Sequence, residues 1–226
     1  APVLGQAVGF YRERVPLEAL RPHFTRVWFN HIAPGPSRTA AIVPDGCLDL
    51  QWFNGVLRVA GPDREAKVEV LPGGTTVIGL RFQAGSAVPW LGVPASEIIN
   101  ERVPLEAFWE REARDLTEWA NEARTVDGIA RRLEAALARR TATVRPPNAI
   151  ARSMFRLVGV SRQPGNWVIR NLRDRLELSE RTLRRHCHEA FGYGPKTLDR
   201  ILRFQRFLRL AQSSHPGGLA ALAVDA

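Results

Sequence analysis

Short apolar runs separated by turn-forming residues dominate the first half of the chain. The turns include Pro44-Asp45-Gly46 and 72–74, whose proline, aspartate and glycine residues favour tight reversals. The apolar runs are rich in valine, isoleucine and aromatic side chains, and they span residues 25–29, 40–43, 47–52, 56–59, 67–71 and 76–82. Runs of this length between turn signals predict a small all-β barrel or sandwich.

The run 47–52 alternates between apolar and polar residues. Successive side chains of a strand point to opposite faces of a sheet. We therefore expect Leu48, Leu50 and Trp52 on one face, with the polar residues between them, Asp49 included, on the other.

The pattern changes to helical spacing after Pro104, which permits a helix to start. Apolar residues recur at that spacing at Leu105, Phe108, Trp109, Leu116, Trp119, Ile129, Leu133 and Leu137. This pattern predicts a helical connector that packs against the barrel or against a partner chain. Two prolines at 146 and 147 then interrupt the chain, and a further helix is expected over Ala149 to Val158.

These breaks divide the chain into three parts. Residues 1–104 are the predicted β-barrel sensor or dimerisation domain, residues 105–145 the helical connector, and residues 146–226 an all-α domain. The expected fold class is α+β.

Two short amphipathic helices follow in the all-α domain. The first covers 168–176, after a turn at 164–166, and the second begins at Ser179, whose hydroxyl can accept from the exposed amides of the first helical turn. The second helix closes at Phe191-Gly192. Two short helices joined by a tight turn predict a helix-turn-helix.

The second of these helices carries its arginines away from its apolar face. Leu183, Cys187 and Phe191 recur every four residues, so they are expected in the core. Arg181, Arg184, Arg185 and His188 then project from the opposite side. A guanidinium can bond guanine through two atoms in the major groove, or it can bind phosphate. The alternative is an ordinary solvated basic face.

Charge is divided unevenly along the chain. Residues 1–110 contain 10 Lys+Arg and 11 Asp+Glu, a net charge of −1, whereas residues 111–226 contain 22 and 12, a net charge of +10. A basic C-terminal half is typical of a chain in which only that half meets a polyanion.

The sequence contains few residues of the types that form catalytic or metal-binding sites. Of two cysteines, Cys187 lies between His186 and His188, but neighbouring residues on a helix point about 100° apart and do not converge on one metal ion. Two cysteines with neither a signal peptide nor a long apolar run favour a reducing cytoplasm. The first half has only His23 and His31, too few for the metal site of a cupin-type enzyme. We therefore expect neither an enzyme nor a metal or cofactor.

The helix-turn-helix region resembles the first half of an AraC/XylS-type DNA-binding domain. The matching segments are 179–185, 191–196 and 200–206, which resemble the family patterns S-x-R-x-L-x-R, G-x-x-P-K and R-x-x-R-F-x-x-A. The resemblance implies that helix 179–190 lies in a major groove and that Arg181, Arg184 and Arg185 read bases. Residues expected at phosphate or positioning contacts are Ser179, Thr182, His188, Lys196, Arg200 and Arg203.

The resemblance also predicts a linking helix from Thr197 to Gln212 and a second helix-turn-helix. Residues 219–226 resemble the opening helix of that second motif, and the sequence ends there. We expect either a truncated chain or a sequence that covers only an ordered portion of the protein.

The first half resembles the small β-barrel sensor domain found in one branch of AraC-type regulators, which implies a cupin-like fold. The matching segments are 43–50, 79–85 and 91–97. Candidates for an effector pocket are Trp28, Asp45, Asp49, Trp52 and Arg81. In the alternative interpretation, the two tryptophans fill the core and Asp45 caps a turn.

Together these features predict a sequence-specific DNA-binding transcription regulator, cytoplasmic and associated with the nucleoid, that is modulated through its barrel. The expected partners are double-stranded promoter DNA, a small-molecule effector, a second copy of the chain and RNA polymerase, with no membrane. Two alternatives stay open: a ligand-free DNA-binding module whose barrel only dimerises, and a metal-dependent cupin-like enzyme.

Overall fold

The computed structural model describes residues 9–161 and 166–212, in which strands come first and helices follow. The strands are β1 (Phe10–Arg14), β2 (Phe24–His31), β3 (Arg38–Ile42), β4 (Asp49–Phe53), β5 (Val56–Ala60), β6 (Lys67–Leu71), β7 (Thr76–Phe82) and β8 (Arg102–Pro104). The helices are α1 (Ala87–Leu91), α2 (Glu106–Asn121), α3 (Val126–Arg140), α4 (Ala149–Val160), α5 (Asn166–Leu176), α6 (Glu180–Phe191) and α7 (Pro195–Gln212). Two short 3-10 helices are η1 (Glu18–Leu20) and η2 (Ala95–Ile98). The predicted α+β class is confirmed.

The strands lie in two antiparallel sheets. The larger sheet has six strands in the order β1-β2-β7-β4-β5-β8, and β3 pairs with β6 in a separate two-stranded sheet. Strand β7 is central and is buried almost along its whole length. The alternation expected for 47–52 is confirmed, because Leu48, Leu50 and Trp52 belong to the apolar core, although β4 itself begins only at Asp49.

Strand β1 has no apolar alternation, and the sequence pattern did not predict it. Its polar side chains bind the helical connector instead. The guanidinium of Arg14 pairs with the buried carboxylate of Glu134 on α3, with Nη2–Oε2 at 2.5 Å, and the same carboxylate accepts from the Leu17 amide at 2.9 Å. Buried charges are stable when paired and hydrogen-bonded in this way.

Helices α2 and α3 lie in the region expected to be a helical connector, and their apolar faces pack on the large sheet. Leu105, Trp109, Leu133 and Leu137 share one apolar cluster with the strands. The helix begins one residue later than expected, since Pro104 is the last residue of β8 and pairs with Arg58. Strand β8 and helix α1 were not predicted from the sequence.

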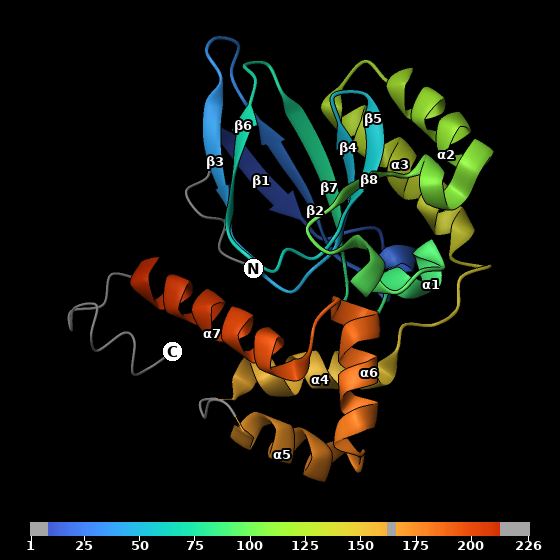
Figure 1. Ribbon diagram of the computed structural model, residues 1–226. Helices are drawn as coiled ribbons and strands as arrows, with labels where there is room; N and C mark the ends of the chain where they lie inside the picture. The colour runs from blue at the N-terminus through green and yellow to red at the C-terminus, as the bar shows by residue number, and fades with distance from the viewer. Residues whose placement is uncertain (1–8, 162–165, 213–226) are drawn as a thin grey trace.

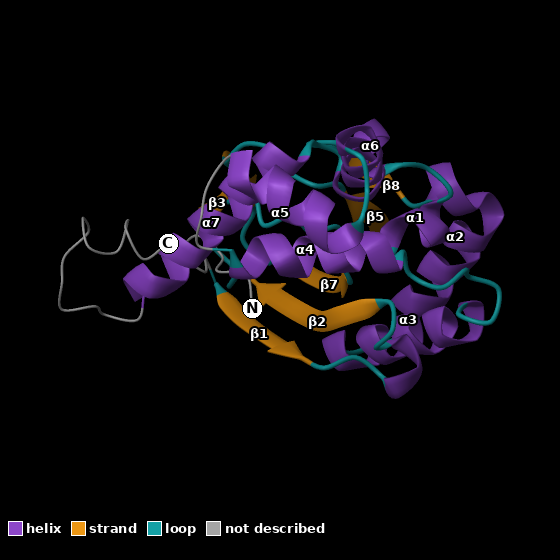
Figure 2. Ribbon diagram, turned by 90° about the horizontal axis from the view of Figure 1, so that it is seen from below, coloured by secondary structure: helices purple, strands orange, loops and turns teal. Residues whose placement is uncertain are grey.

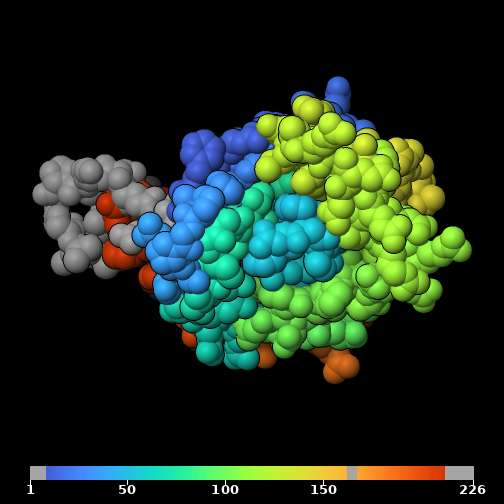
Figure 3. Space-filling model, turned by 90° about the horizontal axis from the view of Figure 1, so that it is seen from above, coloured from blue at the N-terminus to red at the C-terminus, as the bar shows by residue number. Residues whose placement is uncertain are grey.

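A second apolar cluster is formed by helices α4 to α7. Its most buried members include Met154, Leu172, Leu183 and Phe191. Figure 1 shows these helices together below the strands, and Figure 2 shows α4 lying across the lower end of the sheet. From the opposite end, the surface is formed by strand residues and by α2 (Figure 3). The strands and the α4–α7 helices thus have separate cores that meet at one end of the sheet.

Candidate functional site

Helices α5 and α6 meet at a tight turn, as the sequence predicts. Glu177 in that turn has a positive φ of 53°, which lets the chain reverse within three residues. Ser179 caps α6, because its Oγ accepts from the Thr182 amide at 3.2 Å. At the other end, Gly192 adopts a left-handed conformation with φ of 81° and its amide bonds the His188 carbonyl. The predicted start and end of this helix are confirmed.

The two faces of α6 differ in the expected way. Leu183, Cys187 and Phe191 are fully buried and pack against Leu172 of α5 within the second apolar cluster. The opposite face exposes the side chains of Arg181, Arg184, Arg185 and His188. The cap, the turn and the core therefore hold these four polar side chains at the surface of one rigid helix.

The arginines of α6 differ in their neighbours. Arg184 bonds Glu180 one turn earlier, with its Nη2 2.7 Å from Oε1. Within the described part of the chain, Arg181 and Arg185 make no ion pair or side-chain hydrogen bond. Exposed pairs one helical turn apart contribute less than about 1 kcal/mol, so Arg184 can exchange its carboxylate for another anion.

The other predicted contact residues lie at the start of α6 and along α7. The hydroxyl of Ser179 is already engaged as the cap and also lies 2.9 Å from the Thr182 hydroxyl. Lys196 and Arg200 are exposed at positions separated by one turn of α7, and Arg203 is partly buried. Helix α5 exposes a further set of arginines that the sequence did not single out: Arg170, Arg173 and Arg175. The polar face of this amphipathic helix is the sequence feature that could have identified these three arginines.

Cys187 is packed in the core between two histidines that diverge, as the sequence predicts. It is fully buried, and burial raises the pKa of its thiol, whereas His188 is exposed. Within the described ranges, no group of three or more histidine, cysteine, aspartate or glutamate side chains is arranged to hold a metal ion. Residues 219–226 and the turn residues Pro164 and Gly165 lie outside the described residues.

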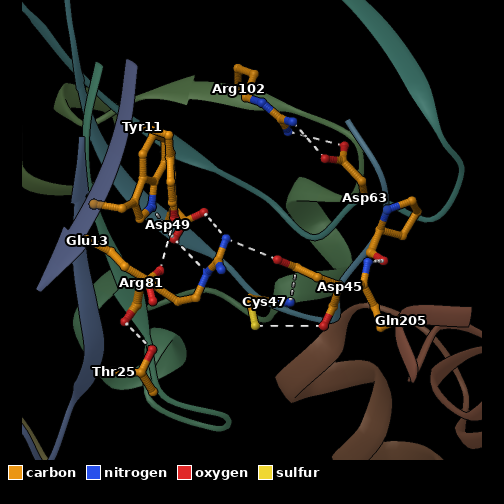
Figure 4. Close-up of polar contacts among 12 residues, drawn as sticks. Tyr11, Glu13, Thr25, Asp45, Cys47, Asp49, Asp63, Arg81, Arg102 and Gln205 are labelled. Carbon is orange, nitrogen blue, oxygen red and sulfur yellow. Dashed lines mark hydrogen bonds and ion pairs between the residues drawn. The ribbon is translucent and has the colours of Figure 1, made fainter. Parts of the chain in front are cut away.

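A charged cluster on the large sheet contains four of the five candidate pocket residues. Arg81 on β7 is the cross-strand partner of Asp49 on β4, and its Nε lies 3.2 Å from Asp49 Oδ1. Its Nη2 lies 3.0 Å from Asp45 Oδ2, so one guanidinium joins two carboxylates (Figure 4). The indole of Trp28 donates to Asp49 Oδ1 at 3.2 Å and lies directly over Gly79, where a Cβ would come within 2.0 Å of the ring.

Burial changes the acidity of this cluster. Burial raises the pKa of the Asp45 carboxyl, against the attraction of Arg81. Burial also raises the pKa of the neighbouring Cys47 thiol well above its ordinary value. The fifth candidate, Trp52, is not part of the cluster. It lies in the core on the other face of the sheet, and its indole donates to Asn121 of α2 at 2.7 Å.

The turn at Pro44 to Leu48 connects this cluster with the C-terminal helices. Asp45 accepts from the Cys47 amide at 2.9 Å, which makes it the turn cap of the alternative interpretation as well as a partner of Arg81. The carbonyl of Pro44 accepts from Gln205 Nε2 of α7 at 2.7 Å. Gly46, at φ of 78°, leaves space for Phe155 of α4, which a Cβ there would approach to 3.0 Å.

Two more contacts join the strands to the C-terminal helices. The Asn148 amide, just before α4, donates to the Gly85 carbonyl at 3.0 Å. Gly192, just after α6, packs so closely on η2 that a Cβ would lie 2.7 Å from Ile99. The ends of α4 and α6 are thus fixed to the N-terminal part of the molecule.

Two comparisons with known proteins found a match, one to the strand-containing part and one to nearly the whole chain. Residues 12–104 match a family model described as a domain of unknown function (DUF6597). A search of curated proteins found no match. Among solved structures, the chain is similar to the crystal structure of an apo form of ToxT from Vibrio cholerae strain SCE256, with a TM-score of 0.45 and 10% sequence identity, over 93% of this chain and 89% of that chain. The family match leaves α2 to α7 outside it.

None of the helices in residues 9–161 and 166–212 combines the length and the hydropathy that a bilayer crossing requires.

Proposed function

We propose that this protein is a sequence-specific DNA-binding transcription regulator of the AraC type, which reads the major groove with α6. The observation that carries the proposal is the exposed face of α6. There Arg181, Arg184 and Arg185 project from a capped helix whose opposite face is fully buried. A B-DNA major groove is wide enough to admit one such helix.

The spacing of these arginines suits base reading. Arg181 and Arg185 are four residues apart, about one helical turn, so both can enter the same groove. Each guanidinium offers two parallel donors to the O6 and N7 acceptors of a guanine. We propose that Arg184 reads a third position and leaves Glu180 when DNA binds, because the exposed pair between them is weak.

Polar and charged residues on and beside α6 are proposed to bind the DNA backbone. Lys196 and Arg200 are exposed on α7, and His188 is exposed near the end of α6. Ser179, Thr182 and Arg203 complete the proposed set. Backbone contacts fix the register of a protein on DNA and make its affinity fall with salt concentration.

The N-terminal sheet is proposed to modulate this activity. The support is the turn at Pro44 to Leu48, which binds Arg81 of the sheet on one side and Gln205 of α7 on the other. A change at the charged cluster therefore acts on the packing of α7 through a single short turn. A ligand or partner that acts through this turn must bind one arrangement of the sheet and the C-terminal helices more tightly than another.

The test is selection of bound sequences from a pool of random DNA duplexes, followed by binding titrations in a series of salt concentrations. We expect a selected sequence to bind more tightly than random DNA. Arg185→Ala should weaken binding to the selected sequence by about 1–3 kcal/mol and relax the preference at one base pair. Arg111→Ala, an exposed arginine of α2, is the matched control and should bind like the unmodified protein.

Two outcomes would contradict the proposal. An equal loss on every sequence for Arg185→Ala would assign this residue to phosphate instead of a base. Failure of the unmodified protein to prefer any sequence over random DNA would exclude sequence-specific binding by α6.

A further inference from the structure

Glu180 places a negative charge among the arginines of α6. It is the first residue of the helix, its side chain is 44% exposed, and Arg184 follows one turn later. The recognition helix of a helix-turn-helix contacts base edges with its N-terminal residues. Glu180 therefore occupies a position from which a side chain can reach a base, although DNA phosphates repel its carboxylate.

Capping of α6 does not use this carboxylate. The Thr182 amide donates to the Ser179 hydroxyl at 3.2 Å, so the cap is complete without Glu180. A negative charge in the first turn is favourable toward the helix dipole, but the effect is small at an exposed position. The helix itself therefore gains little from Glu180.

The ion pair of Glu180 engages only one of its two carboxylate oxygens. Arg184 approaches Oε1 with its Nε at 3.1 Å and with its Nη2 at 2.7 Å. In residues 9–161 and 166–212, no donor bonds Oε2 of Glu180. The carboxylate thus keeps an unused acceptor on the exposed face of α6.

Binding of DNA would change the partner of this carboxylate. Under the proposed function, on which this inference rests, Arg184 leaves Glu180 for a base. A carboxylate that enters a groove between phosphates without a donor is unfavourable, because it loses water and gains no hydrogen bond. The exchange is favourable where the DNA supplies a donor to Glu180 in return.

The major groove offers two such donors. The N4 amino group of cytosine and the N6 amino group of adenine donate there, whereas guanine and thymine present acceptors. Adenine carries the acceptor N7 beside its N6, and this nitrogen repels a carboxylate. Cytosine has no acceptor of its own in the major groove, and glutamate is one of its usual partners. Cytosine is therefore the base that fits an unpaired carboxylate best.

We infer that Glu180 is a specificity-determining residue that accepts a hydrogen bond from the N4 amino group of a cytosine at one position of the bound DNA. Thymine or guanine at this position turns an acceptor toward the carboxylate and is excluded by repulsion. The same charge weakens binding to DNA that lacks the cytosine. Glu180 thus separates the specific site from other DNA by attraction and by repulsion.

The experiment is selection from random DNA duplexes with the unmodified 226-residue chain and with two variants. We expect the unmodified chain to select cytosine at one position and to lose about 5–100-fold in affinity when thymine replaces it. A glutamine amide pairs with N6 and N7 of adenine, so Glu180→Gln should change the preferred base there from cytosine to adenine. Glu180→Ala should lose this preference and bind random DNA more tightly.

Two further variants separate base reading from other effects. Arg184→Ala should change the preference at a different position from that of Glu180→Ala. A Glu180 that only held Arg184 in place would lose preference at the same position as Arg184→Ala. Glu118→Gln removes one negative charge from an exposed position of α2 and should leave the selected sequence unchanged.

The failure of this inference is distinguishable from the failure of the proposed function. If the unmodified chain selects a sequence and Glu180→Gln selects the same one, Glu180 reads no base and the proposed DNA binding stands. Loss of preference at one shared position in Glu180→Ala and Arg184→Ala would likewise overturn direct reading by Glu180. Failure of the unmodified chain to select any sequence would overturn both.

Discussion

Gln205 of α7 and Pro44, separated by 161 positions in the sequence, are joined by a buried hydrogen bond of 2.7 Å from the side-chain amide to the backbone carbonyl. The next residue, Asp45, binds Arg81 of the sheet at 3.0 Å. The turn before β4 is consequently held by α7 on one side and by β7 on the other. This arrangement is one of the contacts that attach the two apolar clusters to each other.

Gln205→Met should lower the free energy of unfolding by about 1–3 kcal/mol, because the buried Pro44 carbonyl loses this donor. The measurement is urea denaturation followed by tryptophan fluorescence. Arg200→Met, at an exposed position of the same helix, is the control and should change stability by less than about 0.5 kcal/mol. Equal stability of the two variants would mean that the bond contributes nothing to the attachment of the turn.

Arg81→Met should lower the free energy of unfolding by about 3–5 kcal/mol at neutral pH, because Asp45 and Asp49 would remain buried without their shared cation. Adding Asp45→Asn and Asp49→Asn to this variant should restore part of the loss. The same denaturation measurement applies, with Arg111→Met in an exposed pair as the control. A loss no greater than that of the control would contradict a buried, coupled cluster.

Glu177→Gly should raise stability by about 0.5–1 kcal/mol. Glu177 is exposed and has a φ of 53°, a conformation that costs a residue with a Cβ about 1–2 kcal/mol and glycine little. Asp174→Gly, at an exposed helical position of α5, should instead lose about 0.5–1 kcal/mol. Opposite signs in thermal unfolding would support the conformation of the turn, and a loss in both variants would refute it.

The stability of the protein should fall as the pH is lowered through the ordinary histidine range, in part because of His23. Burial, and then the charge of Arg152 on α4, lower the pKa of His23 below 6.5. A group with a lowered folded-state pKa favours the neutral form on folding. Its contribution is therefore complete above pH about 6.5 and is lost progressively as the pH falls below that value toward the lowered pKa.

His23→Leu should flatten the dependence of the unfolding free energy on pH between about 7.5 and 5.5. His31→Leu, which replaces an exposed histidine of β2, should leave the slope in place. If His23→Leu retained the full slope, the dependence would have to come from other groups.

The elements that the sequence predicts well are those whose pattern is local. The run 76–82 became β7, and the spacing of Leu183, Cys187 and Phe191 correctly identified the buried face of α6. Ser179 and Gly192 define the ends of α6 by local capping chemistry that needs no tertiary contact. Such features depend on neighbours within one or two turns of the chain.

The elements that were missed depend on distant partners. Strand β1 is polar, and nothing near Arg14 in the sequence indicates that it binds Glu134 on α3. Helix α1 is short and contains a proline, which is a weak helical signal. Trp52 was grouped with Asp49 although their alternation already placed them on opposite faces of the strand.

Only one wall of the candidate pocket could be predicted from the sequence. Asp45, Asp49 and Arg81 were recognised as polar residues within apolar runs, and the strands bring them together. The opposite wall, with Phe155 and Leu202, is contributed by helices that lie 74 to 157 positions further along the chain. Which helices cover the end of a sheet is decided by tertiary packing and not by the spacing of residues along the chain.

The fit of Gly46 against α4 and α7 limits how these parts can be exchanged between proteins. A Cβ at Gly46 would lie 3.0 Å from Phe155, 3.4 Å from Leu198 and 3.7 Å from Leu202, so the bare turn covers three apolar side chains. A gene fusion that joined α4–α7 to a different N-terminal part would expose these three side chains to solvent and create an apolar surface prone to aggregation. Exchange of α4–α7 between proteins therefore succeeds only when the incoming partner supplies an equally narrow turn at this place.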